Sequence, residues 1–452
     1  MNTGSGQKEP ILNRSELLKY FYEGFKPQEK FKVGLEFEKI GVYSSDFTAA
    51  RYSGSAGIKA FIDEYYKTDN FSYISEDGNI LGLHNRDYEI SLEPGSQFEI
   101  STAPKKTVHD IAEEIKNYNK KTSLLAENFG IKWLGYGIQP LSTYENIELI
   151  PKKRYQIMTE YLPGKGNSAL VMMRETAGIQ TAVDHNSEED AYYKLRTFLG
   201  LSPIVTAMFA NSPIRKGKES GYKSYRAFGW LNTDERRCGY ISSKIFEENF
   251  GFEDYVDVLL DLPMVFLKKD NKWVNMQGIS FREYLDKGFE GYVADIDDWL
   301  MHRTSFFPEV RLNSYLEIRN CDCQRADLIP AIPALWKGIA YDNDAMNAAW
   351  ELVKDFSWEE RQNLRREVTK YALDTPIGKL KVLDLAKELV NIADFSLKKM
   401  KNLNAEGDDE SIYLERVKEL LSRGYSPADE ILELLNNSWK KDLSKLIDYV
   451  RL

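Results

Sequence analysis

Cysteine, histidine and long apolar runs are all scarce in this 452-residue chain. It has three cysteines, Cys238, Cys321 and Cys323, and four histidines. An odd, sparse set of cysteines is no disulfide framework and offers poor spacing for a zinc site. No run of about 18 uncharged apolar residues is present, and the first residues lack the apolar core of a secretory signal. We therefore expect a cytoplasmic protein with reduced thiols and no membrane partner.

Basic charge is also in deficit. The chain has 60 Lys+Arg against 70 Asp+Glu, which gives a formal net charge of -10 and a pI near 5.3. Such a chain has no general positive field to attract phosphate backbones, so nucleic acid is not an expected partner. The glycine-rich signatures of the P-loop and of the dinucleotide-binding fold are absent as well. Any bound nucleotide must therefore be held by metal ions and arginines.

Apolar periodicity predicts the secondary structure. A hydrophobic content of 42% and a charged content of 29% are typical of an ordered globular protein. Helical spacing predicts helices over 14–24 and 104–130, a helix pair broken at Pro203, and a helical region over 331–452. Strands are predicted over 31–43, 131–140 and 306–320, and as a hairpin formed by YEISLE and QFEIS.

Hairpin-linked strands with helices between and after them favour an α+β fold built on an antiparallel sheet over a doubly wound fold. In the turn Glu93-Pro94-Gly95-Ser96, proline presets one backbone angle and glycine tolerates a positive φ at the next position. We expect a mixed catalytic region over residues 1–330, followed by a helical region over residues 331–452.

Carboxylates recur on one face of several predicted strands. In VGLEFEKIGVY, Glu36 and Glu38 point to the same side of the strand because side chains alternate. A solvated strand face would explain one such pair. The pattern returns, however, in DYEISLEPGSQFEIS and in VRLNSYLEIRN, where polar residues again share a face: Glu89, Ser91 and Glu93; Gln97 and Glu99; Arg311, Asn313, Tyr315, Glu317 and Arg319.

A sheet face that gathers these carboxylates would suffer strong like-charge repulsion unless cations lie between them. Mg²⁺ and Mn²⁺ prefer oxygen ligands, and Mg²⁺ commonly bridges carboxylates to nucleotide phosphates. We therefore predict metal ligands at Glu36, Glu38, Glu93, Glu99 and Glu317.

Four arginines lie in or near these unusual segments, and arginine forms bidentate contacts with carboxylate and phosphate groups. They are Arg154, Arg226, Arg311 and Arg319. No Ser-His-Asp or Cys-His pattern appears, so a covalent nucleophile is not indicated.

The order of several motifs resembles a known family. GLEFEK, ISLEPGSQFEIS, WLGYGIQP, PKKRYQIM, FANSP and FPEVRLNSYLEIR stand in the order seen in the plant-type glutamate–cysteine ligases, the second family of these enzymes. The resemblance implies a glutamine-synthetase-like fold, in which an antiparallel sheet forms a funnel lined by metal-binding glutamates. It also implies ATP- and Mg²⁺-dependent joining of the γ-carboxylate of L-glutamate to the amine of L-cysteine through a γ-glutamyl phosphate, the first step of glutathione synthesis.

The resemblance also assigns roles to residues. It implies metal binding by the five glutamates named above and a catalytic, phosphate-side position for Arg319, with Arg311 beside it. It implies contacts with the substrates for a further set of residues: Arg154, Thr176, Gln180, Arg226 and Trp230.

One segment departs from the family pattern. In RETAGIQTAVD, Gly178 stands where the family has a substrate-contacting threonine, and Ala182 stands where it has an asparagine. The loss of two polar side chains leaves open a ligase of the same family that uses a different acceptor amine. A two-metal phosphohydrolase and a non-catalytic binding protein are further alternatives, and both a monomer and a homodimer remain possible. The plant enzymes' regulatory cysteine pairs are not evident, so we expect no redox switch of that kind.

Overall fold

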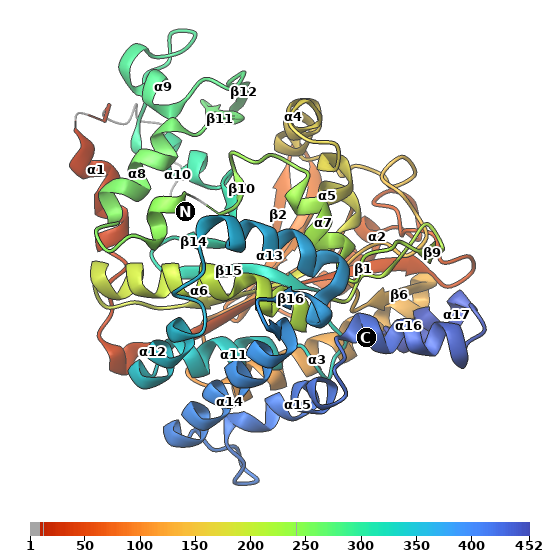
Figure 1. Cartoon of the computed structure of the whole chain (residues 1–452). Coiled ribbons are helices and arrows are strands. Elements are labelled where there is room, and N and C mark those ends of the chain that lie inside the picture. Colours follow the sequence, from red (N-terminus) through yellow and green to blue (C-terminus); the bar gives the residue numbers. More distant parts are fainter. Residues whose placement is uncertain (1–9, 12, 241) are drawn as a thin grey trace.

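A nine-stranded sheet forms the centre of the computed structural model, which describes residues 10–11, 13–240 and 242–452 (Figure 1). The strand order is β14-β15-β7-β1-β5-β4-β3-β2, and β6 pairs with the far half of β1. Every pairing in this sheet is antiparallel. The predicted α+β fold on an antiparallel sheet is confirmed.

Long and short strands contribute to the sheet. They are β1 (Val33–Tyr43), β2 (Ser72–Glu76), β3 (Asn79–His84), β4 (Tyr88–Leu92), β5 (Phe98–Thr102), β6 (Ile131–Leu134), β7 (Gly178–Val183), β14 (Val310–Leu312) and β15 (Leu316–Asp322). Four small pairs lie outside it: β8 (Ile214–Arg215) with β9 (Lys218–Glu219), β10 (Cys238–Gly239) with β13 (Phe307–Pro308), β11 (Phe266–Lys269) with β12 (Lys272–Asn275), and β16 (Pro376–Ile377) with β17 (Leu380–Lys381).

Helices precede, separate and follow these strands. Up to residue 330 they are α1 (Arg14–Tyr22), α2 (Ile58–Tyr66), α3 (Val108–Ala126), α4 (Lys153–Tyr161), α5 (Ala169–Glu175), α6 (Glu188–Met208), α7 (Tyr225–Leu231), α8 (Phe252–Asp261), α9 (Phe281–Lys287) and α10 (Ile296–Arg303). Beyond it they are α11 (Ala331–Ala340), α12 (Asn343–Glu351), α13 (Trp358–Tyr371), α14 (Val382–Met400), α15 (Glu415–Ser422), α16 (Pro427–Asn437) and α17 (Leu443–Tyr449). Within the described ranges, none of them is long and apolar enough to cross a membrane.

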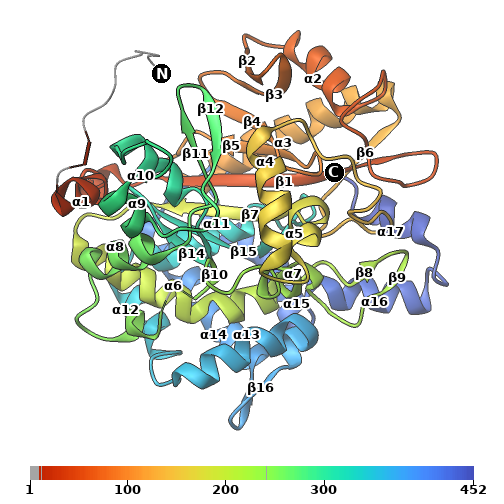
Figure 2. The same ribbon diagram turned by 90° about the horizontal axis from the view of Figure 1, so that it is seen from above.

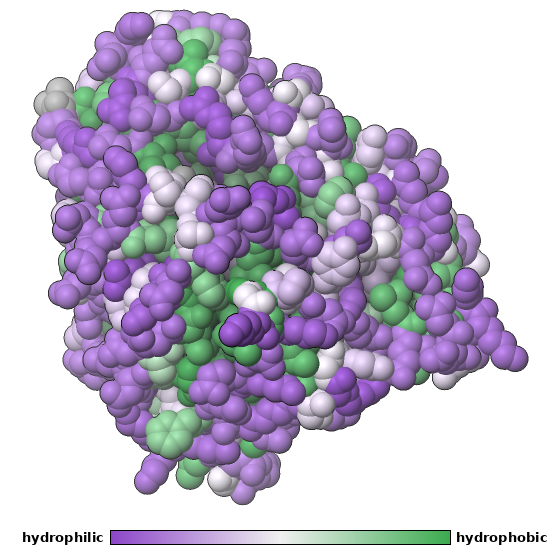
Figure 3. Space-filling model, viewed as in Figure 1, coloured by the Kyte–Doolittle hydropathy of each residue, from purple (hydrophilic) through white to green (hydrophobic). Residues whose placement is uncertain are grey.

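Helices cover both sides of the sheet. In Figure 1, α3, α11 and α14 lie below it, and α4 and α5 lie above it. Seen from above in Figure 2, α4 and α5 pass in front of β1. The outer surface is mainly polar in the view of Figure 3, with apolar side chains gathered near the middle of that face. The polar side of the sheet is thus roofed by α4 and α5, and its other side rests on α11.

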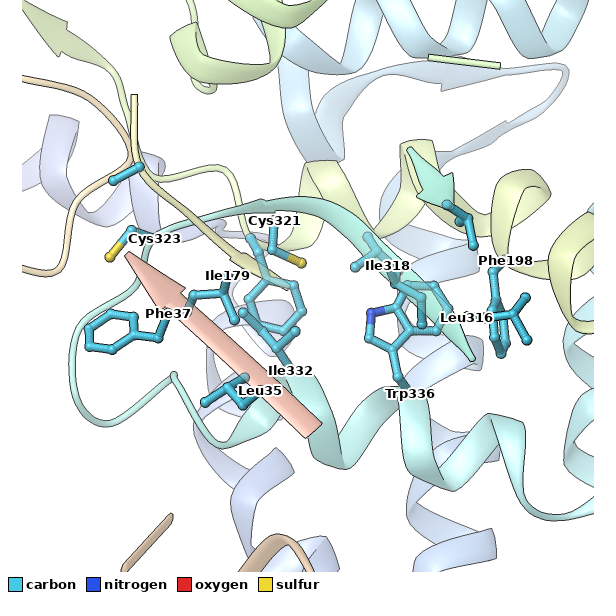
Figure 4. Packing of buried hydrophobic residues seen from close by; sticks show 14 of the residues in the cluster. Leu35, Phe37, Ile179, Phe198, Leu316, Ile318, Cys321, Cys323, Ile332 and Trp336 are labelled. Atoms are coloured by element: carbon cyan, nitrogen blue, oxygen red, sulfur yellow. The ribbon is translucent and has the colours of Figure 1, made fainter. Parts of the chain in front are cut away.

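The alternation predicted for β1 separates the two sides of the sheet. Leu35 and Phe37 are at most 1% exposed and pack with Ile179 of β7. Figure 4 shows these side chains on the side of the sheet where Ile332 and Trp336 rise from α11. The hydrophobic effect therefore fixes which side of β1 faces the core, and the intervening glutamates must face the other way.

The segment 306–320 is not the single strand that was predicted. It turns at Asn313–Tyr315 and forms a hairpin of β14 and β15 in which Arg311 pairs with Glu317. The Asn313 N–H donates to the Tyr315 carbonyl at 2.7 Å and closes the turn. The predicted alternation missed this turn because no glycine or proline stands at the turn itself, and Asn313 and Ser314 are its only turn-favouring residues.

Two further local predictions were wrong. The predicted break at Pro203 does not occur: α6 runs through it, because Leu199 and Val205 on either side are completely buried and packing offsets the lost backbone hydrogen bond. The positive φ in the hairpin turn, 65°, belongs to Ser96. Gly95 is required for space instead, since a Cβ there would lie 2.9 Å from the Cα of Arg174.

The C-terminal helices reach the sheet through α11, which packs against β7 and β1. The predicted cap at Ser426 is confirmed, since its hydroxyl accepts from the Asp429 N–H. A buried ion pair within the C-terminal part also contacts the first part. Lys337 of α11 donates to Glu410 at 2.6 Å, and the Val108 N–H at the start of α3 donates to the same carboxylate. The division of the chain near residue 330 stays a prediction.

Removing one member of this buried pair should destabilise the fold. We expect Lys337→Met to lower the free energy of unfolding by about 3–5 kcal/mol, because Glu410 is left as an uncompensated buried charge. Lys354→Met breaks the exposed pair with Glu351 and should change it by less than about 1 kcal/mol. Urea unfolding of both variants measures the difference, and similar values would contradict the assigned role of the buried pair.

Candidate active site

A cavity of about 310 Å³ lies between the polar side of the sheet and α4 and α5. Four of the predicted metal ligands line it, and so do several of the other predicted site residues. Its lining includes Glu36, Glu38, Glu93, Glu99, Arg154, Thr176, Gln180, Trp230, Arg311 and Arg319. Residues that are far apart in the sequence thus meet in one place.

Strand pairing explains why the glutamates of β1 face this cavity together with β5 and β7. Glu38 is directly opposite Glu99 of β5, and Glu36 is opposite Gln180 of β7. The Gly178 N–H donates to Glu38 Oε2 at 2.7 Å, and the Gln180 amide donates to Glu38 Oε1 at 3.3 Å. The β7 strand therefore holds the Glu38 carboxylate in a fixed orientation.

The hairpin of β4 and β5 supplies the second pair of carboxylates. Glu99 lies on β5 and accepts from the Ser91 hydroxyl at 2.6 Å. Glu93 follows β4 and accepts from the Tyr155 hydroxyl of α4 at 3.0 Å. Each carboxylate is thus positioned by a neutral hydroxyl group, which orients it without neutralising its charge.

Burial and mutual repulsion raise the pKa values of this cluster. Burial, followed by the charge of Glu317, raises the pKa of Glu36 to about 8. Burial and then Glu93 raise the pKa of Glu38 to about 7. Burial and the neighbouring carboxylates also raise the pKa of Glu99 well above its usual value. When these carboxyl groups are ionised, the positive charge around them does not balance their negative charge.

Glu317 is in a different environment from the other four glutamates. Arg311 binds it through two nitrogens at 2.8–3.0 Å, and Arg319 and the Asn313 amide donate to it as well. Burial alone would raise the pKa of Glu317, but the two guanidinium groups outweigh burial and lower it to about 2. Metal binding by Glu317 stays a prediction, and it requires these donors to release an oxygen.

Arg319 contacts several side chains of the cavity wall. Its guanidinium donates to Gln180 Oε1 as well as to Glu317, and it lies 6.0 Å from the ring centroid of Trp230. Arg154, from the first turn of α4, lies 5.1 Å from the ring of Phe266. These positions are consistent with a phosphate or carboxylate bound between the arginines.

Thr176 and Arg226, two of the residues predicted to contact substrate, have contacts that the sequence did not predict. The Thr176 hydroxyl donates to the Met172 carbonyl at 2.6 Å, so its donor is already used. Arg226 does not appear in the wall of the main cavity. It lines a smaller recess of about 50 Å³ that shares Trp230, Phe307 and Arg319 with the cavity.

Sequence reasoning missed several residues of the cavity wall. Lys152 and Tyr155 stand one position away on either side of the pair Lys153 and Arg154, and both line the cavity. Burial lowers the pKa of Lys152, although the charge of Glu93 opposes this shift. The motif PKKRYQIM contained a sign of this position. Lys152 directly precedes α4, whose first turn lies beside the glutamates of the cavity.

The cavity residues have the oxygen ligands that divalent cations need, but they are not arranged to hold an ion without further movement or further ligands. Carboxylate oxygens are the ligands that Mg²⁺ and Mn²⁺ prefer, and four half-buried or buried glutamates line this cavity. Within the part of the chain that the structure describes, no three Asp, Glu, His or Cys side chains are already close enough to hold one ion. Binding therefore requires side-chain rotations of these glutamates or oxygen ligands from a substrate, as is usual for Mg²⁺ with nucleotide phosphates.

Comparison with known proteins shows the family of the chain. A family model described as glutamate–cysteine ligase family 2 matches residues 32–448. The chain belongs to glutamate–cysteine ligase family 2. It is 36% identical over 435 residues to glutamate–cysteine ligase B, chloroplastic, from Oryza sativa subsp. japonica, covering 96% of this chain and 86% of that protein. It is also 36% identical over 440 residues to the chloroplastic enzyme of Arabidopsis thaliana, covering 97% of this chain and 82% of that protein.

A solved structure shares the fold of this family member. The glutamate–cysteine ligase of Francisella tularensis in complex with AMP superimposes with a TM-score of 0.51 and 14% sequence identity, covering 94% of this chain and 89% of that one. At this identity the likeness shows the fold alone.

The expected cytoplasmic location is contradicted by these relatives, which are chloroplastic enzymes. The expectation rested on the absence of a secretory signal with an apolar core. Transit peptides of plastids have no such core and are recognised by other features, so the absence did not bear on the question.

The repulsion within the cluster predicts an unusual pH dependence for the metal-free protein. Raised carboxyl pKa values mean that the folded state binds more protons than the unfolded chain between about pH 4.3 and the pKa of about 8 at Glu36. The free energy of unfolding should therefore fall as pH rises through this window, by on the order of 3 kcal/mol. Urea unfolding in the presence of a chelator measures the slope.

Glu36→Gln should make this dependence shallower, because glutamine cannot ionise and one like charge is removed from the cluster. Glu113→Gln, at an exposed position of α3, should leave the slope unchanged. An equal slope in Glu36→Gln and in the unaltered protein would contradict the electrostatic description of the cluster.

Proposed function

We propose that the protein is an ATP- and Mg²⁺-dependent ligase that joins the γ-carboxylate of L-glutamate to the amine of L-cysteine. The observation that carries this proposal is the meeting of four glutamates from β1 and from the β4–β5 hairpin with arginines of β14, β15 and α4 in one cavity. Family membership over nearly the whole chain and the relatives' names support the choice of substrates. This reaction is the first step of glutathione synthesis.

A free carboxylate is a poor acyl donor, because its leaving group would be oxide. In the first half of the reaction, an oxygen of the glutamate γ-carboxylate attacks the γ-phosphorus of ATP and ADP leaves, which gives a γ-glutamyl phosphate. Arg319 and Arg311 lie on the wall of the cavity and are placed to balance negative charge on the transferred group. Glu317 holds both guanidinium groups in orientation, because Arg311 donates to both of its oxygens and Arg319 donates to Oε1.

Glu36, Glu38, Glu93 and Glu99 are the residues that would hold the divalent cations. Bound there, the cations supply neutralisation of the phosphate charge and orientation of the phosphate chain. The protein's own contribution is to fix these carboxylates through the Gly178 N–H and the hydroxyls of Ser91 and Tyr155.

In the second half, the amine attacks the acyl carbon of the γ-glutamyl phosphate and phosphate leaves as the amide bond forms. The attacking ammonium must first lose a proton. A phosphate oxygen of the substrate is one candidate acceptor of that proton, and a cavity carboxylate that is not engaged by a cation, such as Glu99, is another.

A second candidate function is a γ-glutamyl ligase of the same family with a different acceptor amine. The observation that favours it is the replacement of two expected polar side chains by Gly178 and Ala182, both on the cavity side of β7. Mass spectrometry of the product formed from L-glutamate, ATP and a mixture of amino acids decides between the two. A γ-glutamyl dipeptide other than γ-glutamylcysteine as the main product would favour the second candidate.

Loss of one carboxylate or one guanidinium from the cavity should abolish turnover. We expect Glu38→Gln and Arg319→Ala each to lower kcat by at least about a hundredfold, since each removes a charge that acts on the transferred phosphoryl group. Release of ADP in the presence of both amino acids measures the effect. Arg51→Ala, at an exposed position outside the cavity, serves as the matched control.

Both variants should remain folded at the temperature of the assay, as followed by circular dichroism. A folded Glu38→Gln or Arg319→Ala variant with a near-normal rate would rule out the proposed assignment of the cavity. ADP release that needs no amine would instead identify a phosphohydrolase.

A further inference from the structure

The side chain of Arg226 occupies the space that a side chain at position 178 would otherwise fill. A Cβ built on Gly178 would lie 2.8 Å from Cζ and 2.9 Å from Nε of Arg226, and closer still to Nη2. Real Cβ atoms do not make such contacts, so the guanidinium would have to move. Gly178 does not have a positive φ, and the backbone itself would accept alanine. The glycine is therefore required here for the position of the arginine.

The guanidinium is held in this position from the other side. Arg226 Nη2 donates to the Arg319 carbonyl at 3.0 Å, and Nη1 lies 4.0 Å from Asp322 Oδ1. Arg226 is 5% exposed. It is thus clamped between the β7 strand at Gly178 and the end of β15, and it has little freedom to move sideways.

The direction of the displacement follows from strand geometry. Position 178 is on the same side of β7 as Gln180, which lines the main cavity. A Cβ at this position would therefore push the guanidinium off the sheet, toward the space above it. With glycine, Arg226 instead lines the recess of about 50 Å³ behind Trp230 and Arg319.

The recess has unused hydrogen-bond donors at its wall. Among the described residues, Nε of Arg226 and Nε1 of Trp230 are buried without a hydrogen-bond partner. Both groups are donors only, so a ligand that satisfies them must offer acceptor oxygens, and a carboxylate is the best match for a guanidinium. Trp230 and Arg319 line both the recess and the main cavity, so the two spaces adjoin.

We propose that Gly178 is a specificity-determining residue, which lets the Arg226 guanidinium lie against β7 and thereby sets the depth at which the carboxylate of an amino-acid substrate is bound. This inference rests on the proposed function for the identity of that substrate. Position 178 does not contact the substrate itself in this proposal. The lack of a side chain there determines where the Arg226 guanidinium lies, and the guanidinium binds the substrate.

The test is Gly178→Ala, which adds one methyl group. We expect the KM for one of the two amino acids, L-glutamate or L-cysteine, to rise about tenfold or more, since a misplacement of about 1 Å is costly in a fitted site. The KM for ATP should stay unchanged, which shows that Glu38, the acceptor of the Gly178 N–H, is undisturbed. Unchanged KM values for both amino acids, or an equal rise for all three substrates, would overturn the proposal.

Gly229→Ala is the matched control. Gly229 lies on α7 with Arg226, but its added Cβ would have Val171 as its nearest neighbour at 4.0 Å. This variant should keep all KM values within about twofold, because an ordinary van der Waals contact displaces nothing. A comparable effect of both alanines would mean that general packing around α7, and not the arginine, is responsible.

A double-mutant cycle tests the path through the arginine. Arg226→Lys replaces the planar guanidinium by a slimmer group, so the effect of Gly178→Ala in that background should shrink to less than about threefold. Strictly additive effects would overturn the proposal.

Calorimetry separates this inference from the proposed function. The unaltered protein should bind one of the amino acids in the absence of turnover, and Gly178→Ala should weaken that binding about tenfold. Binding that responds in this way without formation of a γ-glutamyl product would refute the proposed reaction and leave the role of Gly178 standing. Equal binding by both proteins, or no binding of either amino acid, would refute the role of Gly178.

Discussion

The burial of like charges on one side of the sheet is the constraint on which the rest of the structure depends. The alternating side chains of β1 place Leu35 and Phe37 against the core, and the same alternation forces Glu36 and Glu38 to the opposite side. The adjacent hairpin adds Glu99 directly across from Glu38. Repulsion within this cluster lowers the stability of the metal-free protein. Functional sites commonly reduce the stability of the fold in this way.

Arginine and glutamate are distributed unevenly around the cavity, and this unevenness has a chemical use. Glu317 is neutralised by Arg311 and Arg319, so that pair of guanidinium groups is fixed before any substrate arrives. Glu36 and Glu99 have no such partner and keep their pKa values high. One part of the wall is therefore prepared for anionic groups, and another part is prepared for cations that bridge to them.

The sequence was sufficient to predict those features that depend on local pattern. The strand at 31–43, the amphipathic helix after residue 104 and the cap at Ser426 follow from periodicity and capping chemistry, and the structure confirms each of them. The grouping of the glutamates in one cavity followed from the shared side of each strand together with the family resemblance.

Features set by tertiary contacts were beyond the reach of the pattern. Pro203 stays inside α6 because the residues on both sides of it are packed in the core. The turn at Asn313–Tyr315 contains no glycine that would indicate a turn in the sequence. The relation of Gly178 to Arg226 joins residues 48 positions apart, so neither residue alone gives a sign of it. The position of Tyr155 beside Glu93 likewise depends on how α4 crosses above the sheet.

The most direct measurement is the anomalous scattering of crystals grown with Mn²⁺ and a non-hydrolysable ATP analogue. The account predicts Mn²⁺ peaks within about 2.2 Å of carboxylate oxygens from Glu36, Glu38, Glu93 and Glu99, with nucleotide phosphate oxygens completing the coordination. Nucleotide bound elsewhere, or Mn²⁺ peaks only at sites outside this cavity, would contradict it.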